Sequence, residues 1–386
     1  MLKTMLKLYE CAFPNRTRRE SIELDNDAWK RVFDMSKKHD LAHIVSYALD
    51  ESNNAIDEPL KKEFDQARKT AIFRYIKACN EIDAISKLFC DKEIPFIPLK
   101  GLVLANYYKE PWLRTSCDID ILIKEEDIEK ATRALSEDLA YTVNSKGQYD
   151  ISTVSPSGVH VELHYKLIEA DFYIAQDLQQ IWCSNEIFQK SSCQYAMTNE
   201  MFLLYHIYHM AKHFLHGGCG IRSFIDLWII KNSLGYDETR ATSLLKNNQL
   251  YEFYEKAIEL TEVWFDSRER TPLIKEMESY VLSGGVYGSL EQNAAMFQVR
   301  RGGRFQHIIR RIFIPYKSMV FYYPSLKKCP ILFPFYQIRR WFRILFCGGR
   351  KRAYNEIVAN SNLSNDKKLR AQLLLKELKL TEFAKN

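Results

Sequence analysis

Apolar side chains recur at helical spacing along the first part of the chain. The repeat runs from Trp29 to Leu49 and again over residues 60–90, with polar residues between the apolar positions. No polar chemistry is concentrated in this stretch. The pattern predicts that residues 1–92 form an N-terminal helical region.

The pattern of apolar and polar residues changes at Ile94, and the new pattern predicts an α/β unit over residues 93–170. Short apolar runs rich in β-branched residues predict buried strands, and the turn at 155–158 between two alternating runs predicts a β-hairpin. In chain order we expect a strand at 96–99, a helix at 102–108, a strand at 118–123, a helix at 125–139, a strand at 141–143 and a hairpin at 149–165.

The remainder of the chain reads as helical. Residues 171–290 are expected to close a cleft over the core, and residues 291–386 form a basic, aromatic and proline-punctuated region. Ser364 is expected to cap a last helix that ends near Phe383. The predicted fold class is therefore α+β, a small mixed β-sheet core with helices, flanked by N-terminal and C-terminal helical regions.

Composition narrows the class of protein. The 386 residues are 46% apolar and 13% aromatic, which is enough for a large core and excludes wholesale disorder. No apolar run reaches the length of about 18 residues that a membrane-spanning helix needs, and the N-terminus is a poor signal peptide. Nine scattered cysteines without a CxxC motif predict reduced thiols rather than a disulfide framework. We therefore expect a cytoplasmic protein.

The net charge of +6 conceals one strongly basic segment. No Asp or Glu lies between Gln292 and Asn355, and 14 Lys and Arg lie between Arg300 and Arg352, which leaves −8 for the rest of the chain. The basic character therefore belongs to one region rather than to the whole protein.

Arginines in this segment, residues 299–352, are interleaved with large apolar residues. The basic positions of the two patterns are Arg300, Arg301, Arg304, Arg310, Arg311, Arg339, Arg340 and Arg343. Three interpretations stay open: a packed helical domain with solvated arginines, an anionic membrane surface with Trp341 at the interface, and nucleic acid. Of the two functional interpretations, the long apolar runs favour peripheral attachment at the inner membrane face.

Two carboxylates share one face of the predicted strand at 118–123. Side chains at i and i+2 of a strand point the same way, so Asp118 and Asp120 lie opposite the apolar face of Ile119, Ile121 and Ile123. Like charges this close repel unless a cation or a proton lies between them. Hard oxygen ligands suit Mg²⁺, with Mn²⁺ as an alternative. The competing interpretation is a solvated polar face.

A second strand has the same two-faced pattern. His160, Glu162 and His164 alternate with apolar residues, so Glu162 can reach the carboxylate pair if the two strands are neighbours. Three carboxylates on two strands could bind the metals of an in-line displacement at phosphorus, with Glu162 as ligand and base.

Other polar residues have both a functional and a plain interpretation. Arg114, in the loop before the carboxylate strand, could hold a phosphate or be a solvated arginine. His206, His209 and His213 share one helical face with Lys212 nearby, and Arg222 and Asp226 follow at i, i+4. A zinc site lacks a further ligand there. His209, Lys212, His213 and Arg222, together with His164, could line the cleft, or they could be satisfied polar residues between helices. We expect Arg222 to pair with Asp226.

Several motifs together resemble the bacterial family of uncharacterised nucleotidyltransferases, within the DNA polymerase β-like superfamily. They are Pro98-Leu99-Lys100-Gly101, Tyr107-Tyr108, Arg114, Asp118-Ile119-Asp120-Ile121-Leu122-Ile123 and Glu162-Leu163-His164-Tyr165. The resemblance covers most of residues 25–345, and its specific motifs lie within 97–165.

The resemblance implies roles for individual residues. Asp118 and Asp120 match the two metal-binding aspartates, and Glu162 falls where a third carboxylate is expected. Gly101 matches the turn whose backbone approaches the triphosphate. That turn is usually Gly-Ser in the superfamily and is Lys-Gly-Leu here, so Lys100 is expected to contact phosphate in place of a serine.

The expected function is Mg²⁺-dependent transfer of a nucleotidyl group from an NTP to an acceptor hydroxyl. The acceptor could be a sugar, another small molecule, a protein side chain or an RNA end, and the sequence does not choose among them. The alternative is a non-catalytic module of the same fold that senses nucleotide or docks at a surface. The oligomeric state is also left open.

Overall fold

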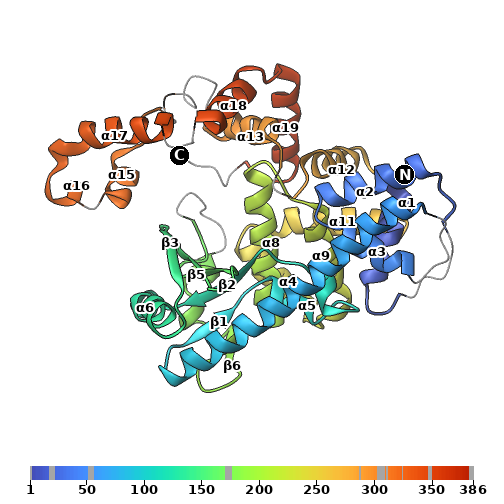
Figure 1. Ribbon diagram of the computed structural model, residues 1–386. Coiled ribbons are helices and arrows are strands. Elements are labelled where there is room, and N and C mark those ends of the chain that lie inside the picture. Colours follow the sequence, from blue (N-terminus) through green and yellow to red (C-terminus); the bar gives the residue numbers. More distant parts are fainter. Residues whose placement is uncertain are drawn as a thin grey trace. The chain divides into compact units, whose positions relative to one another are not determined.

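The computed structural model describes most of the chain (Figure 1). The described residues are 2–16, 22–50, 56–169, 176–286, 288–301, 309, 312–323, 325–346 and 350–381. The chain divides into two compact units, one of Met1–Met210 with Gly220–Lys275 and one of Ala211–Cys219 with Glu276–Asn386. The four-part division expected from the sequence, with boundaries at 92, 170 and 290, stays a prediction.

The first unit begins with helices, as the sequence predicts. They are α1 (Leu2–Tyr9), η1 (Glu10–Ala12), α2 (Asn26–Lys38), α3 (Ala42–Asp50) and α4 (Glu58–Asp91). The side chain of Asp25 caps α2 by accepting from Ala28 N, and the side chain of Asp57 caps α4 by accepting from Leu60 N. Because α4 is 34 residues long, it reaches from the N-terminal helices to the sheet (Figure 1).

A five-stranded mixed sheet forms the centre of the first unit. Its order is β1 (Phe96–Pro98), β2 (Asp118–Ile123), β5 (His160–His164), β4 (Asp150–Val154) and β3 (Thr142–Lys146). The β2–β5 pair is parallel and the other pairs are antiparallel. Ile119, Ile121 and Ile123 face a core that includes residues of α4 and of α6 (Ile128–Asp138). The predicted α+β class is confirmed.

Shorter elements and helices complete this unit. They are α5 (Gly101–Ala105), η2 (Pro111–Leu113), η3 (Glu125–Asp127), α7 (Gln176–Gln179), η4 (Ile181–Cys183), β6 (Ile187–Gln189), β7 (Tyr195–Met197), α8 (Asn199–Leu215, whose last turn falls in the second unit), α9 (Ile221–Ser233), α10 (Glu238–Asn247) and α11 (Tyr251–Phe265). The β6–β7 hairpin corrects the expectation of an all-helical stretch after 171. Its strands are three residues long, too short for a periodic signal, and Phe96 N donates to Cys193 O beside it.

The second unit is helical. Its elements are α12 (Pro272–Gly284, which begins in the first unit), α13 (Leu290–Arg301), α15 (Tyr316–Tyr322), α16 (Ser325–Lys328), η5 (Pro330–Leu332), α17 (Phe333–Phe346), α18 (Arg350–Ser361) and α19 (Asn365–Glu377). Gln298 of α13 donates to Asn360 Oδ1 of α18 over 2.8 Å. Ser364 caps α19 as predicted, because its hydroxyl accepts from Lys367 N. Arg304, Arg310 and Arg311 lie outside the described residues.

The cysteines differ from the sequence expectation at one pair. Cys90 at the end of α4 and Cys193 before β7 form a disulfide, although 103 positions separate them. The prediction that all nine thiols are reduced is therefore wrong for this pair. Local spacing cannot reveal such a bond, since only the packing of α4 beside the β6–β7 hairpin brings the two side chains together. Within the described ranges, no helix combines the length and apolar character needed to cross a bilayer.

Candidate functional site

The two polar-faced strands predicted from the sequence are direct neighbours. In the parallel β2–β5 register, Asp118 is opposite His160, Asp120 is opposite Glu162 and Leu122 is opposite His164. Opposed residues on neighbouring strands point to the same side of a sheet. The condition set for Glu162, that its strand lies beside the carboxylate strand, is therefore met.

Asp120, Glu162 and His164 form a compact group of possible metal ligands. One ligand atom from each lies within 4.8 Å of the other two. His164 Nε2 is 2.7 Å from Asp120 Oδ1 and 3.5 Å from Glu162 Oε2. Two carboxylates with one imidazole suit a divalent ion such as Mn²⁺ or Mg²⁺. His164, placed in the cleft wall from sequence, thus completes the group, and Asp118 is on the same face but is not a member of it.

Lys100 lies beside Asp120 rather than in an open turn. Its ammonium Nζ is 3.2 Å from Asp120 Oδ2, and the Asp120 side chain is only 4% exposed. Burial by itself raises the pKa of Asp120, but the Lys100 ammonium and the His164 hydrogen bond outweigh it and hold that pKa well below its usual range. Burial disfavours the charged form of Lys100, yet the nearby carboxylates keep the pKa of Lys100 raised. The pair is therefore charged on both sides.

At Glu162 the effects that raise the pKa of the carboxyl group outweigh those that lower it. Burial, followed by the negative charge of Asp120, raises the pKa of the Glu162 carboxyl above its ordinary value. Its side chain is 35% exposed, so it stays within reach of a bound molecule. A partly exposed carboxylate with a raised pKa is a better proton acceptor than an ordinary surface carboxylate.

The Lys100–Gly101 turn closes against the entrance of β2. Lys100 has a positive φ of 48°, unusual for a residue other than glycine. A Cβ atom at Gly101 would lie 3.1 Å from Ser116 Oγ, so the glycine backbone packs closely against the Ser116 side chain. Ser116 Oγ also donates to Asp118 Oδ1 over 3.0 Å. Ser116 therefore places a hydroxyl beside the turn, and the sequence analysis missed this residue although it lies two positions before Asp118.

The Arg114 side chain is only 9% exposed and is ion-paired, which excludes the solvated-loop interpretation. Its Nε donates to Asp226 Oδ1 over 2.7 Å, and the hydroxyl of Tyr108 donates to the same oxygen over 2.6 Å. The expected Arg222–Asp226 pair is wrong, because Arg222 instead lies 3.3 Å from Asp40 Oδ2 and donates to Thr115 O. An i, i+4 spacing allows a pair within a helix, but partners from the loop before β2 and from the α2–α3 connection are available to both side chains.

The histidine-bearing helix α8 contributes mainly buried polar contacts. His206 Nε2 lies 3.0 Å from Ser223 O, and burial lowers the pKa of this imidazole. The ring of His209 lies 6.4 Å from that of Tyr205. Tyr205, which the sequence reasoning missed, lies beside Lys100, and burial raises its pKa. Lys212 and His213 belong to the second unit, so the cleft-lining role expected for them, as for His209 and Arg222, stays a prediction.

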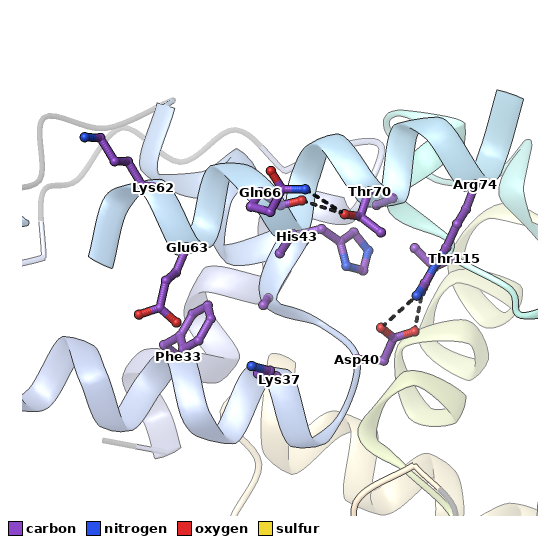
Figure 2. A pocket seen from close by; sticks show the side chains of 13 residues that line it. Phe33, Lys37, Asp40, His43, Lys62, Glu63, Gln66, Thr70, Arg74 and Thr115 are labelled. Atoms are coloured by element: carbon purple, nitrogen blue, oxygen red, sulfur yellow. Dashed lines mark hydrogen bonds and ion pairs between the residues drawn. The ribbon is translucent and has the colours of Figure 1, made fainter. Parts of the chain in front are cut away.

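Two hollows lie near the carboxylate strand. One, of about 460 Å³, lies among α2, α3 and α4, and its wall includes Phe33, His43, Arg74 and Thr115 (Figure 2). Asp40 at its edge faces Arg74 and Thr115 (Figure 2). It borders the loop that leads into β2, and none of the three grouped ligands lines it. The other hollow has a volume of about 700 Å³, and its wall includes Leu122, which is opposite His164 in the β2–β5 register.

The class of the protein, a nucleotidyltransferase, follows from a family match that covers more than half of the chain. Residues 25–266 match the family model described as uncharacterised nucleotidyltransferase. The chain belongs to this family. No curated protein sequence matches the chain.

Solved structures resemble the chain weakly. The antibiotic-resistance factor ANT(2'')-Ia is 12% identical over 45% of this chain and 92% of its own, with a TM-score of 0.35. The Thermotoga maritima CCA-adding enzyme, solved in complex with tRNA, is 13% identical over 83% of this chain and 87% of its own, with a TM-score of 0.24. The assignment therefore rests on the family match.

Proposed function

We propose that the protein transfers a nucleotidyl group from an NTP to the hydroxyl of an acceptor and that it needs a divalent metal ion. One observation carries the proposal: Asp120 and Glu162 lie opposite each other on parallel strands, and His164 completes a group of ligand atoms within 4.8 Å. Membership in a family described as nucleotidyltransferases agrees with this chemistry.

Asp120, Glu162 and His164 would hold the ion, and Asp118 would add a carboxylate from the same face. A bound divalent ion supplies neutralisation of charge on the phosphate oxygens. Because His164 offers nitrogen, Mn²⁺ is expected to bind at least as tightly as Mg²⁺.

The residues of the chain divide the remaining work. The backbone at Gly101 approaches the triphosphate, and the Lys100 ammonium exchanges Asp120 for a phosphate oxygen when the NTP binds. Arg114 is already committed to Asp226, so it positions the loop before β2 and does not grip phosphate itself. Glu162, whose side chain is 35% exposed beside Asp120, accepts the proton of the acceptor hydroxyl.

Label transfer tests the proposal. Purified protein is incubated with the four NTPs labelled at the α-phosphate, Mg²⁺ or Mn²⁺, and acceptors extracted from cells. We expect label in an acceptor fraction with wild-type protein and none with Asp120→Asn. Lys61→Gln, on an exposed face of α4, is the matched control and should behave as wild type. NTP binding without label transfer in either metal would instead support the non-catalytic nucleotide-sensing alternative.

A second proposal concerns the basic C-terminal region. On α17 the exposed apolar residues Phe335, Ile338, Phe342 and Phe346 follow helical spacing, beside Arg339 and Arg343. An apolar stripe flanked by arginines is typical of helices that lie on an anionic membrane surface. Trp341 is not part of this stripe, because its indole N–H donates to Ile312 O. The packed-domain interpretation fits Arg340, which is buried and also donates to Ile312 O.

Co-sedimentation with liposomes tests the membrane proposal. We expect binding only to liposomes that contain anionic lipid, weakened by salt, and lost in the Arg339→Glu, Arg343→Glu double variant. Arg340 is left unchanged because its contacts are internal. Binding that ignores lipid charge would contradict the proposal, and binding to RNA in place of lipid would favour the nucleic-acid interpretation.

A further inference from the structure

The larger hollow lies at the carboxyl ends of β2 and β5, and none of the three grouped ligands lines it. Leu122 in its wall is the cross-strand partner of His164 and lies two residues beyond Asp120, about 7 Å along the strand. Asp120 and Leu122 point to the same side because their spacing is two. Lys166, also in the wall, follows His164 by two residues. Leu122 and Lys166 therefore connect the hollow to the carboxylate face, while Tyr165 in the same wall packs against the core on the opposite face.

The wall of this hollow combines aromatic rings with hydrogen-bonding groups. The rings are those of Tyr149, Tyr165 and Trp182, and the amides are those of Gln148 and Gln179. The indole N–H of Trp182 is shielded from solvent and has no hydrogen-bond partner among the described residues. A buried donor without a partner is costly, and an acceptor on a bound molecule would relieve that cost.

The charges in the wall cancel one another. Lys124 and Lys166 are balanced by Glu125 and Glu126. Lys166 Nζ lies 3.0 Å from Glu125 Oε1, and the Lys124 ammonium lies over the Trp182 ring at 5.7 Å. A strongly anionic or polycationic ligand would gain little here. The volume of about 700 Å³ falls in the range of small-molecule sites.

The phosphate-binding turn is at the other end of β2. Gly101 approaches Ser116 and Arg114, which precede the strand, and Lys124 in the wall of the hollow follows it. Asp118 and Asp120 lie between the two ends. In an in-line displacement the attacking and leaving oxygens are on opposite sides of the phosphorus atom. If the triphosphate of the NTP lies at the turn, the acceptor hydroxyl attacks from the opposite end of β2, where the hollow lies.

We propose that this hollow binds the acceptor and that the acceptor is a neutral, hydroxyl-rich ring molecule of the sugar class. The inference rests on the proposed function. Aromatic rings pack against the apolar C–H faces of such a ring, and the amide, carboxylate and indole groups pair with its hydroxyls. The acceptor hydroxyl oxygen attacks the α-phosphorus, its proton passes to Glu162, and the bond to the bridging oxygen breaks so that pyrophosphate leaves with the electron pair.

Saturation-transfer NMR on the full-length protein tests the assignment without relying on turnover. The probes are a set of neutral methyl glycosides and disaccharides, with adenosine and glucosamine for comparison. We expect the neutral sugars to bind, and we expect Tyr149→Ala and Trp182→Ala each to weaken binding about tenfold. Phe73→Ala, at an exposed ring on α4, is the matched control and should leave binding unchanged. Thermal unfolding of each variant verifies that it is folded.

A second readout places the sugar relative to the ligand group. Mn²⁺ should speed the relaxation of bound sugar protons in wild-type protein and not in Asp120→Asn. The proposal is overturned if no neutral sugar binds, if adenosine or glucosamine binds in preference, or if both aromatic variants bind normally. Sugar binding without any label transfer would contradict the proposed function and leave the sugar site standing. If both aromatic variants retained full label transfer, the sugar site would be contradicted and the proposed function would stand.

Discussion

The ammonium of Lys100 lies 3.2 Å from Asp120 Oδ2 at a side chain that is nearly inaccessible to solvent. The sequence places two carboxylates on one strand face and so predicts repulsion between them. In the folded protein the cation that relieves this repulsion comes from the chain itself. Lys100, at a positive φ before Gly101, is held there by the short β1 strand and its pairing with β2.

Asp120→Asn is therefore expected to lower stability as well as activity. The substitution leaves the half-buried Lys100 ammonium without its partner at the buried Asp120 position, and breaking such a pair costs about 3 kcal/mol. Urea unfolding should show this loss, and label transfer should fall at least about 100-fold. Asp118→Asn is the control for stability, because among the described residues the Asp118 carboxylate accepts one hydrogen bond, from the Ser116 hydroxyl, and forms no ion pair. A higher melting temperature in Asp120→Asn would show that repulsion outweighs the ion pair.

Glu162→Gln is expected to slow turnover more than it weakens NTP binding. The amide keeps the shape and some ligand capacity of the side chain but cannot accept the acceptor proton. We expect kcat to fall about 100-fold, with NTP affinity measured by calorimetry changed less than about tenfold. Equal losses in both quantities would make Glu162 a metal ligand alone.

The buried Arg114–Asp226 pair is expected to behave as a unit. Asp226→Asn removes the counter-charge of Arg114 and one partner of Tyr108, so unfolding free energy should fall by about 3–5 kcal/mol. The double variant Arg114→Met, Asp226→Leu should recover part of that loss, because no unpaired charge is left buried. Denaturant unfolding of Arg114→Met, Asp226→Leu and the double variant measures the coupling. Strictly additive losses would contradict it.

His43 is expected to make stability depend on pH. Burial lowers the pKa of His43 to about 4 in the folded protein, against about 6.5 when exposed. Between these values the unfolded chain binds a proton that the folded chain does not, so stability falls as the pH falls from about 6.5 to 4, by on the order of 3 kcal/mol. His43→Gln, which can still donate to Leu113 O, should flatten the profile. The exposed His160→Gln variant should not.

The Cys90–Cys193 disulfide is expected to stabilise the oxidised protein. Its reduction, or Cys90→Ser, should cost about 2–4 kcal/mol, as is typical of a native disulfide. Melting temperatures of the wild-type protein with and without a reductant test this expectation, and the reduced wild-type protein and Cys90→Ser should melt at the same temperature. Cys183→Ser, at an exposed free cysteine, is the control. A wild-type protein that is insensitive to the reductant would contradict the prediction.

The sequence by itself determined which residues share a face and where several elements begin. Strand periodicity put Asp118 and Asp120 on one side and three isoleucines on the other, and the structure keeps that division. The cap at Ser364 was also readable, because a cap depends on residues three positions apart. These properties are local, and the backbone geometry of a strand or helix end is enough to produce them.

Only the tertiary structure decided which distant side chains meet. The pairing of β2 with β5 brought His164 to Asp120 across 44 positions. Asp226 pairs with Arg114, 112 positions away, and not with Arg222 as expected. Cys90 is bonded to Cys193, 103 positions away. Periodicity states which way a side chain points but not which element packs against it. That choice depends on burying apolar faces such as that of β2 and on giving each buried charge a partner.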